Sequence, residues 1–193
     1  MTMVRPQASL LLVLTLLLPI EAARAQGLGQ SALLYSGETS FFVQPPPGWR
    51  LDSEQGKSDG VLAAVYRIGE SWRTGSAVMY AHTLPLAAAT PRAFSDQLRA
   101  AEAEWRGRNA RGEVSSLASI VSEDSSVAVI KRFVAAATSQ FAVVAYFRQE
   151  RAVPILVLSA RTRAELDRAY PDFLRLVRSY GIGPTVKAAR RTG

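Results

Sequence analysis

The chain of 193 residues contains no cysteine. Disulfide frameworks, cysteine-based zinc sites, iron–sulfur clusters and cysteine nucleophiles all require cysteine side chains, so each of these is excluded. A lipid attached to an N-terminal cysteine is excluded for the same reason. Any structural or catalytic role of the protein must therefore depend on other side chains.

The sequence contains a single histidine, His82. Imidazole-based acid–base or metal chemistry would have to use this residue. The sequence has no Gly-x-Ser-x-Gly nucleophile motif and no His-x-x-x-His metal motif. Gly56-Lys57-Ser58 lacks the preceding glycine spacing of a phosphate-binding loop. We therefore expect no enzymatic activity, no cofactor and no metal; a hydrolase that uses His82 is the least favoured alternative.

Long apolar runs are confined to the first 25 residues. Arg5 supplies a positive start, residues 8–20 form an apolar run, and Ala23-Arg24-Ala25 is a small-x-small cleavage site before Gln26. This layout is typical of a secretory signal peptide. The run is shorter than the ~20 apolar residues that cross a membrane. We therefore expect cleavage after Ala25, no transmembrane segment in the mature chain, and a periplasmic or secreted protein.

The formal net charge is +7, and the first 25 residues contribute +1 of it through Arg5, Arg24 and Glu21. An exported chain with a remaining charge of +6 meets anionic lipid headgroups or wall polymers rather than nucleic acid. The expected partner is accordingly a protein or cell-envelope component, including anionic ones. In the alternative interpretation, single arginines on polar faces only keep the surface solvated.

The rest of the chain predicts one domain, residues 32–182, between a flexible leader (26–31) and a basic disordered tail (183–193). Residues 45–48 (Pro-Pro-Pro-Gly) cannot continue a sheet ladder and predict a hinge between the first strands and the main sheet, and residues 51–60 predict a polar loop. Alternating or apolar segments predict strands at residues 32–35, 40–44, 61–68, 76–84, 116–122, 127–135, 140–149 and 153–160.

Two segments have helical periodicity. Thr90-Pro91 opens the first, and Gly107–Gly112 ends it. Thr162 to Glu165 forms a capping box that opens the second, in which Pro171 should produce a kink or break near Tyr170 and Gly181 a stop. The strands at 140–149 and 153–160 are apolar on both faces, so both faces must be covered. The predicted fold class is α+β, an antiparallel sheet between helices in an α/β/α sandwich.

The order of these elements resembles the PsbP-like superfamily, which includes the photosystem II extrinsic subunit PsbP, a Ran-binding nuclear import factor and many small exported bacterial proteins. The likeness covers about residues 41–180 and depends mainly on Phe41 to Leu51, which contains Pro-Pro-Pro-Gly-Trp, and on Ser179-Tyr180. It implies a sheet between helices and a binding or assembly role rather than catalysis. It carries over no functional residues.

Aromatic residues of the Pro-rich stretch, two adjacent strands and their connection suggest a binding site. Trp49, Tyr66, Trp72, Tyr80 and His82 are expected to line it, with Arg67 and Arg73 at the rim. Tryptophan, tyrosine and arginine are the residues that most often dominate binding energy. Trp49 and Tyr66 also fit a core, and this interpretation is favoured for Trp49. The predicted binding residues are therefore Trp72, Tyr80, His82, Arg67 and Arg73.

The sequence thus favours an exported, non-enzymatic binding or assembly module. The alternative is a small-molecule or lipid carrier with a pocket beneath the sheet.

Overall fold

A computed structural model of the protein describes residues 31–37, 39–86 and 90–184. The predicted signal peptide, almost all of the predicted leader and most of the predicted tail lie outside the described residues. Within the described residues, no helix is long and apolar enough to cross a membrane.

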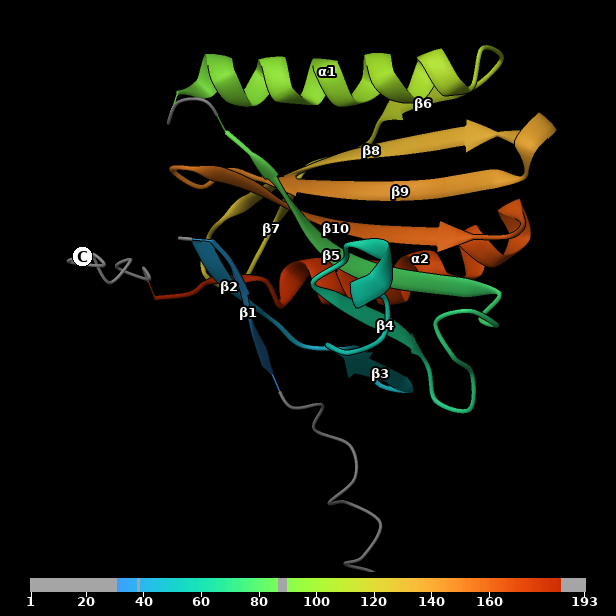
Figure 1. The fold of residues 1–193 in the computed structure, drawn as a ribbon, viewed down its shortest axis with the longest axis horizontal. Helices are drawn as coiled ribbons and strands as arrows, with labels where there is room; N and C mark the ends of the chain where they lie inside the picture. Colours follow the sequence, from blue (N-terminus) through green and yellow to red (C-terminus); the bar gives the residue numbers. More distant parts are fainter. Residues whose placement is uncertain (1–30, 38, 87–89, 185–193) are drawn as a thin grey trace, which may run out of the picture.

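An eight-stranded antiparallel sheet forms the centre of the fold (Figure 1). Its strand order is β3-β4-β5-β10-β9-β8-β6, and β7 pairs with β8 beside β6. The strands are β3 (Trp49–Asp52), β4 (Ala63–Arg67), β5 (Ala77–Pro85), β6 (Glu113–Ser116), β7 (Ile120–Val121), β8 (Val127–Ala135), β9 (Gln140–Phe147) and β10 (Ala152–Ala160).

Two hydrophobic clusters pack against the two faces of this sheet. One contains Met79, Leu156 and Leu158 together with the buried side of helix α2 (Arg163–Arg178), which includes Leu166 and Phe173. The other cluster joins strand residues to the apolar side of helix α1 (Pro91–Arg108). β9 and β10 contribute to both clusters, as expected for strands that are apolar on both faces. The predicted α+β sandwich is confirmed.

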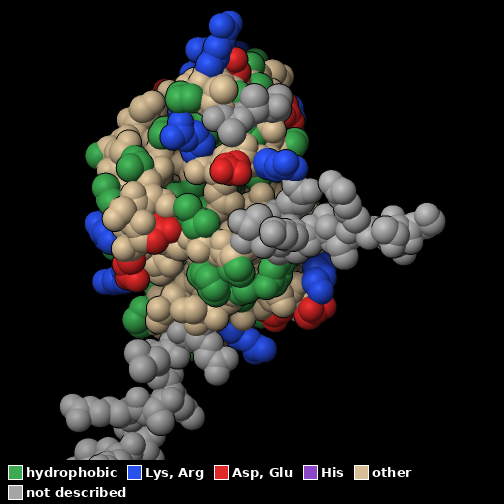
Figure 2. All heavy atoms as spheres, turned by 90° about the vertical axis from the view of Figure 1, so that its left-hand side faces the viewer, with side chains coloured by type: hydrophobic (Ala, Val, Ile, Leu, Met, Phe, Trp, Pro, Cys, Tyr) green, Lys and Arg blue, Asp and Glu red, His purple; other side chains and the backbone are tan. Residues whose placement is uncertain are grey.

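A second, three-stranded sheet, in the order β1-β2-β11, packs at one side of the molecule. It consists of β1 (Ala32–Ser36), β2 (Thr39–Val43) and β11 (Gly181–Ile182). Its outer face carries Leu33, Tyr35 and Phe42, and Tyr35 is 54% exposed. Figure 2 shows hydrophobic side chains gathered on this side of the molecule. Of the predicted tail, Gly183 and Pro184 are described, and both hydrogen-bond to Ser40.

Residues 45–48 connect this small sheet to the large one, as the sequence predicts. Gly48 has a φ of 81°, which a glycine adopts without strain, and its carbonyl accepts a hydrogen bond from the amide of Ile68. The amide of Trp49 bonds the carbonyl of Pro46 and closes the turn. The chain therefore leaves one sheet and enters the other within a single tight turn.

Both helix starts follow their sequence signals. The Thr90 hydroxyl accepts a hydrogen bond from the amide of Ala93, and the Thr162 hydroxyl accepts one from the amide of Glu165. The Glu165 carboxylate instead accepts a hydrogen bond from Ser76, which ties α2 to the start of β5.

Four local predictions need correction. The predicted polar loop included residues 51 and 52. These residues instead belong to strand β3 (residues 49–52), because they pair with β4. The strand predicted over 116–122 is divided into β6 and β7. Helix α2 continues through Pro171, since its buried side chains hold it against the sheet. The helix ends at Arg178 and is capped by Ser179, whose amide bonds the carbonyl of Arg175, and Gly181 begins β11.

Candidate binding surface

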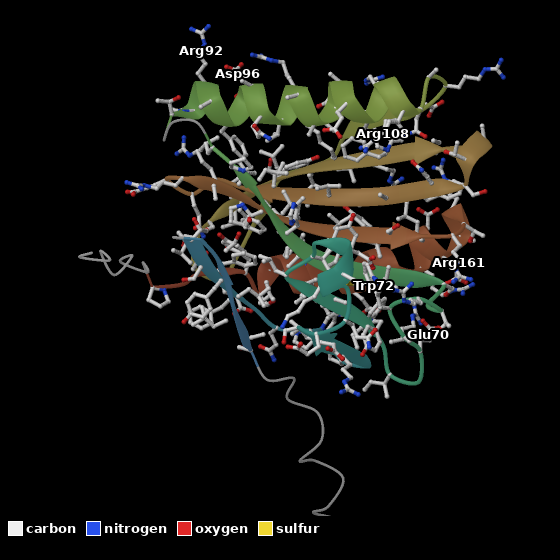
Figure 3. All side chains as sticks on the ribbon, in the orientation of Figure 1. Glu70, Trp72, Arg92, Asp96, Arg108 and Arg161 are labelled. Carbon is white, nitrogen blue, oxygen red and sulfur yellow. The ribbon has the colours of Figure 1, made fainter. Side chains whose placement is uncertain are left out.

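Trp72 lies on the loop between β4 and β5, over the face of the sheet that also carries α1 (Figure 3). Its indole N–H donates to the Asp59 carboxylate at 2.7 Å. Its ring meets the ring of Tyr80 edge to face, with centroids 5.6 Å apart. Two contacts from different segments therefore fix the orientation of this half-buried side chain.

The loop of residues 53–62 supports Trp72 from the other side. It starts where the Asp52 carboxylate accepts hydrogen bonds from the amides of Gln55 and Glu54, and these bonds lower the pKa of Asp52. Gly56 is buried with a φ of 81°. A Cβ atom at this position would lie 2.4 Å from the Val61 side chain and 3.4 Å from the Trp72 ring. Only glycine allows the loop to approach Trp72 this closely.

Tyr80 and His82 lie on β5 on the same side as Trp72, because alternate residues of a strand share a face. Ala77, Met79 and Ala81 point to the opposite cluster. Burial raises the pKa of the Tyr80 hydroxyl, so the group is neutral at physiological pH. His82 is half-buried, and its Nδ1 atom is buried without a hydrogen-bond partner among the described residues.

Arg67 does not lie on this surface. Its guanidinium lies 5.1 Å from the centre of the Trp49 ring on the α2 side of the sheet, where Trp49 belongs to the core cluster. The indole N–H of Trp49 donates to Asp172 of α2 at 3.0 Å. Trp49 is thus a core residue, in agreement with the interpretation favoured from the sequence.

Arg73 follows Trp72 in the loop and has an exposed side chain. Its backbone carbonyl accepts a hydrogen bond from the guanidinium of Arg161 at 3.0 Å. Arg161 begins the connection from β10 to α2, so this bond holds the loop against the body of the domain (Figure 3). The structure therefore brings Trp72, Tyr80 and His82 to one face with Arg73 beside them, and places Arg67 on the other.

Three further residues of this face were not singled out from the sequence. Tyr146 of β9 lies among the hydrophobic residues under α1. Lys131 of β8 forms an ion pair with Glu102 of α1, and the two side chains are 15% and 21% exposed. Only the strand register, which brings β5, β10, β9 and β8 side by side, could have linked these residues to Tyr80 and His82.

The described residues contain no group of three or more histidine, cysteine, aspartate or glutamate side chains arranged to hold a metal. Among these residues, no carboxylate hydrogen-bonds to His82. A histidine that acts as a general base normally has such an orienting partner.

No model of a known protein family and no curated protein matches the chain. The fold is nevertheless recognisable, because a large antiparallel sheet with a helix on each face is consistent with the PsbP-like arrangement predicted from the sequence. One similar solved structure is that of cyanobacterial PsbP (CyanoP) from Synechocystis sp. PCC 6803. The match covers 86% of this chain and 99% of that one, with a TM-score of 0.51 and 11% identity. At this identity the likeness concerns the fold alone.

Proposed function

We propose that the protein is an exported, non-enzymatic binding module that acts on a protein or cell-envelope component through the surface around Trp72. The observation that carries the proposal is the fixed orientation of this loop tryptophan between Asp59 and Tyr80. A side chain that is already ordered loses little conformational entropy on binding. Loops held on a rigid sheet are common positions for recognition residues.

The surroundings of Trp72 favour an anionic partner. Arg73 is exposed beside it and has no ion-pair partner among the described residues. The predicted mature chain carries a net charge of +6. Exposed cations beside an aromatic side chain attract acidic proteins and anionic envelope polymers. The predicted export after Ala25 would bring the protein to such partners.

A small-molecule or lipid carrier is the second candidate. The observation that favours it is the buried and unpaired Nδ1 atom of His82, beside the hydrophobic residues under α1. A hydrolase that depends on His82 has weaker support, because no described carboxylate contacts its Nδ1 atom.

The proposal is tested by affinity capture from envelope extract with the immobilised protein, followed by titration of each captured component. We expect Trp72→Ala to weaken binding about tenfold or more, as loss of a central aromatic contact does. The matched control is Ile68→Ala, which removes an apolar side chain that is 72% exposed beside the same loop. This variant should bind like the wild-type protein.

Thermal melting of both variants separates loss of contact from loss of fold. Identical capture and identical affinities for wild-type protein and a folded Trp72→Ala variant would contradict the proposal. Equal weakening by Ile68→Ala would mean that the contact is unspecific and would also contradict it.

A further inference from the structure

Exposed hydrophobic side chains gather at one end of the molecule. Five large hydrophobic side chains are more than half exposed in the described part of the chain, and four of them lie at this end. Tyr35 lies on β1 and Ile182 on β11, while Val121 and Val127 pair where β7 meets β8. Figure 2, which faces this end, shows hydrophobic side chains gathered on it. Single exposed apolar residues are ordinary, whereas a group of them marks an interaction site.

The small sheet and the turn between β7 and β8 hold these side chains in one region. The Ile182 amide donates a hydrogen bond at 2.7 Å to the carboxylate of Asp124, which lies in that turn. β11 and β1 pair with the two edges of β2, so Ile182 and Tyr35 belong to one sheet. Two half-buried side chains of its outer face complete the group. We call the group the apolar end, and it consists of Leu33, Tyr35, Phe42, Val121, Val127 and Ile182.

A basic segment begins beside the apolar end. The carbonyl of Pro184, the last described residue, accepts a hydrogen bond at 2.6 Å from the hydroxyl of Ser40 on β2. Residues 185–193 follow it and contain Lys187, Arg190 and Arg191 but no acidic residue. The other charges next to the small sheet nearly cancel; they are Glu38, Glu123, Asp124 and Glu150 against Arg148, Arg151 and Arg178. The excess positive charge of this end therefore comes from residues 185–193.

The composition of this end favours a lipid surface over a protein partner. Leucine and valine are under-represented among the residues that dominate protein–protein binding, and the apolar end contains no tryptophan or arginine. A second copy of the chain would bring the same positive segment and offers no complementary charge. Tyrosine suits the boundary between lipid and water, where its ring is apolar and its hydroxyl is hydrated. Lysine and arginine beside apolar side chains attract anionic headgroups.

We propose that the apolar end docks the protein on an anionic membrane surface. Tyr35, Ile182 and their aliphatic neighbours enter the interface, and the cations of residues 185–193 contact the phosphates of the headgroups. The attachment is peripheral and reversible, because only a few side chains leave water. This goes beyond the proposed function, because the apolar end includes neither Trp72 nor any residue that contacts it.

Co-sedimentation with lipid vesicles tests the proposal. The protein used begins at Gln26, which keeps every described residue and removes the apolar run of residues 8–20, because that run would itself bind lipid. We expect vesicles of equal parts phosphatidylcholine and phosphatidylglycerol to bind the protein at least about tenfold more tightly than phosphatidylcholine vesicles. Each lysine or arginine near an anionic surface strengthens binding about fivefold. Raising the salt concentration should reduce the difference.

Two triple variants with the same net charge locate the cations. The tail variant combines Lys187→Ala, Arg190→Ala and Arg191→Ala, and it should lose the preference for vesicles with phosphatidylglycerol. The control combines Arg106→Ala, Arg108→Ala and Arg111→Ala, which remove three exposed cations at and just after the C-terminal end of α1. The control should keep the preference, since these cations lie away from the small sheet.

A tryptophan placed in the apolar end reports contact with lipid. Tyr35→Trp puts an indole at a position that is 54% exposed, and brominated phosphatidylcholine in the mixed vesicles should quench its added emission. The control Ile68→Trp follows β4 and is 72% exposed, and its emission should not be quenched. The emission of the wild-type tryptophans is subtracted in both cases. Tyr35→Ser should weaken vesicle binding about fivefold or more, because it removes apolar area from the interface.

Equal binding to both kinds of vesicle, a preference that survives in the tail variant, or unquenched emission of Tyr35→Trp would overturn the proposal. A dimer that forms without lipid and that Tyr35→Ser disrupts would assign the apolar end to a second copy and would also overturn it. Capture of an acidic protein without any vesicle binding would have the same consequence. Trp72→Ala should bind vesicles like the wild-type protein, so vesicle binding and partner capture test separate surfaces.

Discussion

Two tryptophans of this protein donate their indole N–H to an aspartate in opposite surroundings. Trp49 is 6% exposed, donates to Asp172 and stacks with Arg67 on the α2 side of the sheet. Trp72 donates to Asp59 on an exposed loop. A hydrogen bond to a charged group contributes more in a buried place than where water can replace either partner. The first contact should therefore stabilise the fold and the second only a local conformation.

We expect Trp49→Phe to lower the free energy of unfolding by about 2 kcal/mol, because it removes a charge-assisted hydrogen bond and buried ring volume. Trp72→Phe should cost less than about 1 kcal/mol, since water can solvate Asp59. Urea denaturation followed by far-UV circular dichroism measures both values without relying on tryptophan fluorescence. Equal losses in the two variants would show that Trp49 has no special structural role.

The sequence alone could have predicted that Arg67 lies apart from the other predicted site residues. Tyr66 and Arg67 are adjacent in one strand, and adjacent strand residues point to opposite faces, so one site could not include both. The sequence could not predict that Tyr146 lies on the same face as Tyr80 and His82. This placement depends on the pairing of β9 with β10 and of β10 with β5. Strand order is a non-local property that alternation within a segment does not reveal.

At the scale of elements, local signals predicted most of the helices and strands. The limits of β8 match the alternation of residues 127–135, and both helix starts match their threonine caps. The predictions were wrong where contacts between residues distant in the sequence determine the local structure. β3 exists because it pairs with β4, and α2 passes through Pro171 because Leu166, Phe173 and Val177 are fully buried on either side of it. Packing of an apolar face outweighs the local cost of one proline.

Pro171 therefore lowers the stability of a helix that packing maintains. Its side chain is exposed, and a proline cannot donate the backbone hydrogen bond that a helix interior offers. We expect Pro171→Ala to raise the free energy of unfolding by about 2 kcal/mol. The control Arg168→Ala, at another exposed position of α2, should change it by less than about 0.5 kcal/mol. Urea denaturation provides the measurement, and unchanged or reduced stability of Pro171→Ala would contradict this prediction.

At the scale of the molecule, the two sequence segments that resemble PsbP-like proteins meet in space. Ser179 exchanges hydrogen bonds with the backbone of Gln44, immediately before the three prolines. The Tyr180 ring stacks on Phe147, with centroids 3.6 Å apart, and on Phe41, with centroids 5.6 Å apart. The segments that carry the resemblance thus form the contact region between the small sheet, the large sheet and α2. It concerns the fold and leaves the face that carries α1 and Trp72 free to differ.

The proposed function also requires that the chain be exported, and the first 25 residues predict how. Arg5 precedes an apolar run too short to span a bilayer, and alanines stand at positions 23 and 25. We expect the protein expressed in a bacterium to be recovered outside the cytoplasm with Gln26 as its first residue, as determined by mass spectrometry.

The cleavage site itself can be tested with a pair of variants. Ala25→Leu puts a bulky side chain at a position that requires a small one, so the uncleaved precursor should accumulate in the membrane fraction. The control Ala22→Leu lies outside the small-x-small pair and should be processed normally. A full-length chain in the cytoplasm of cells expressing the wild-type gene would remove the basis for an envelope partner.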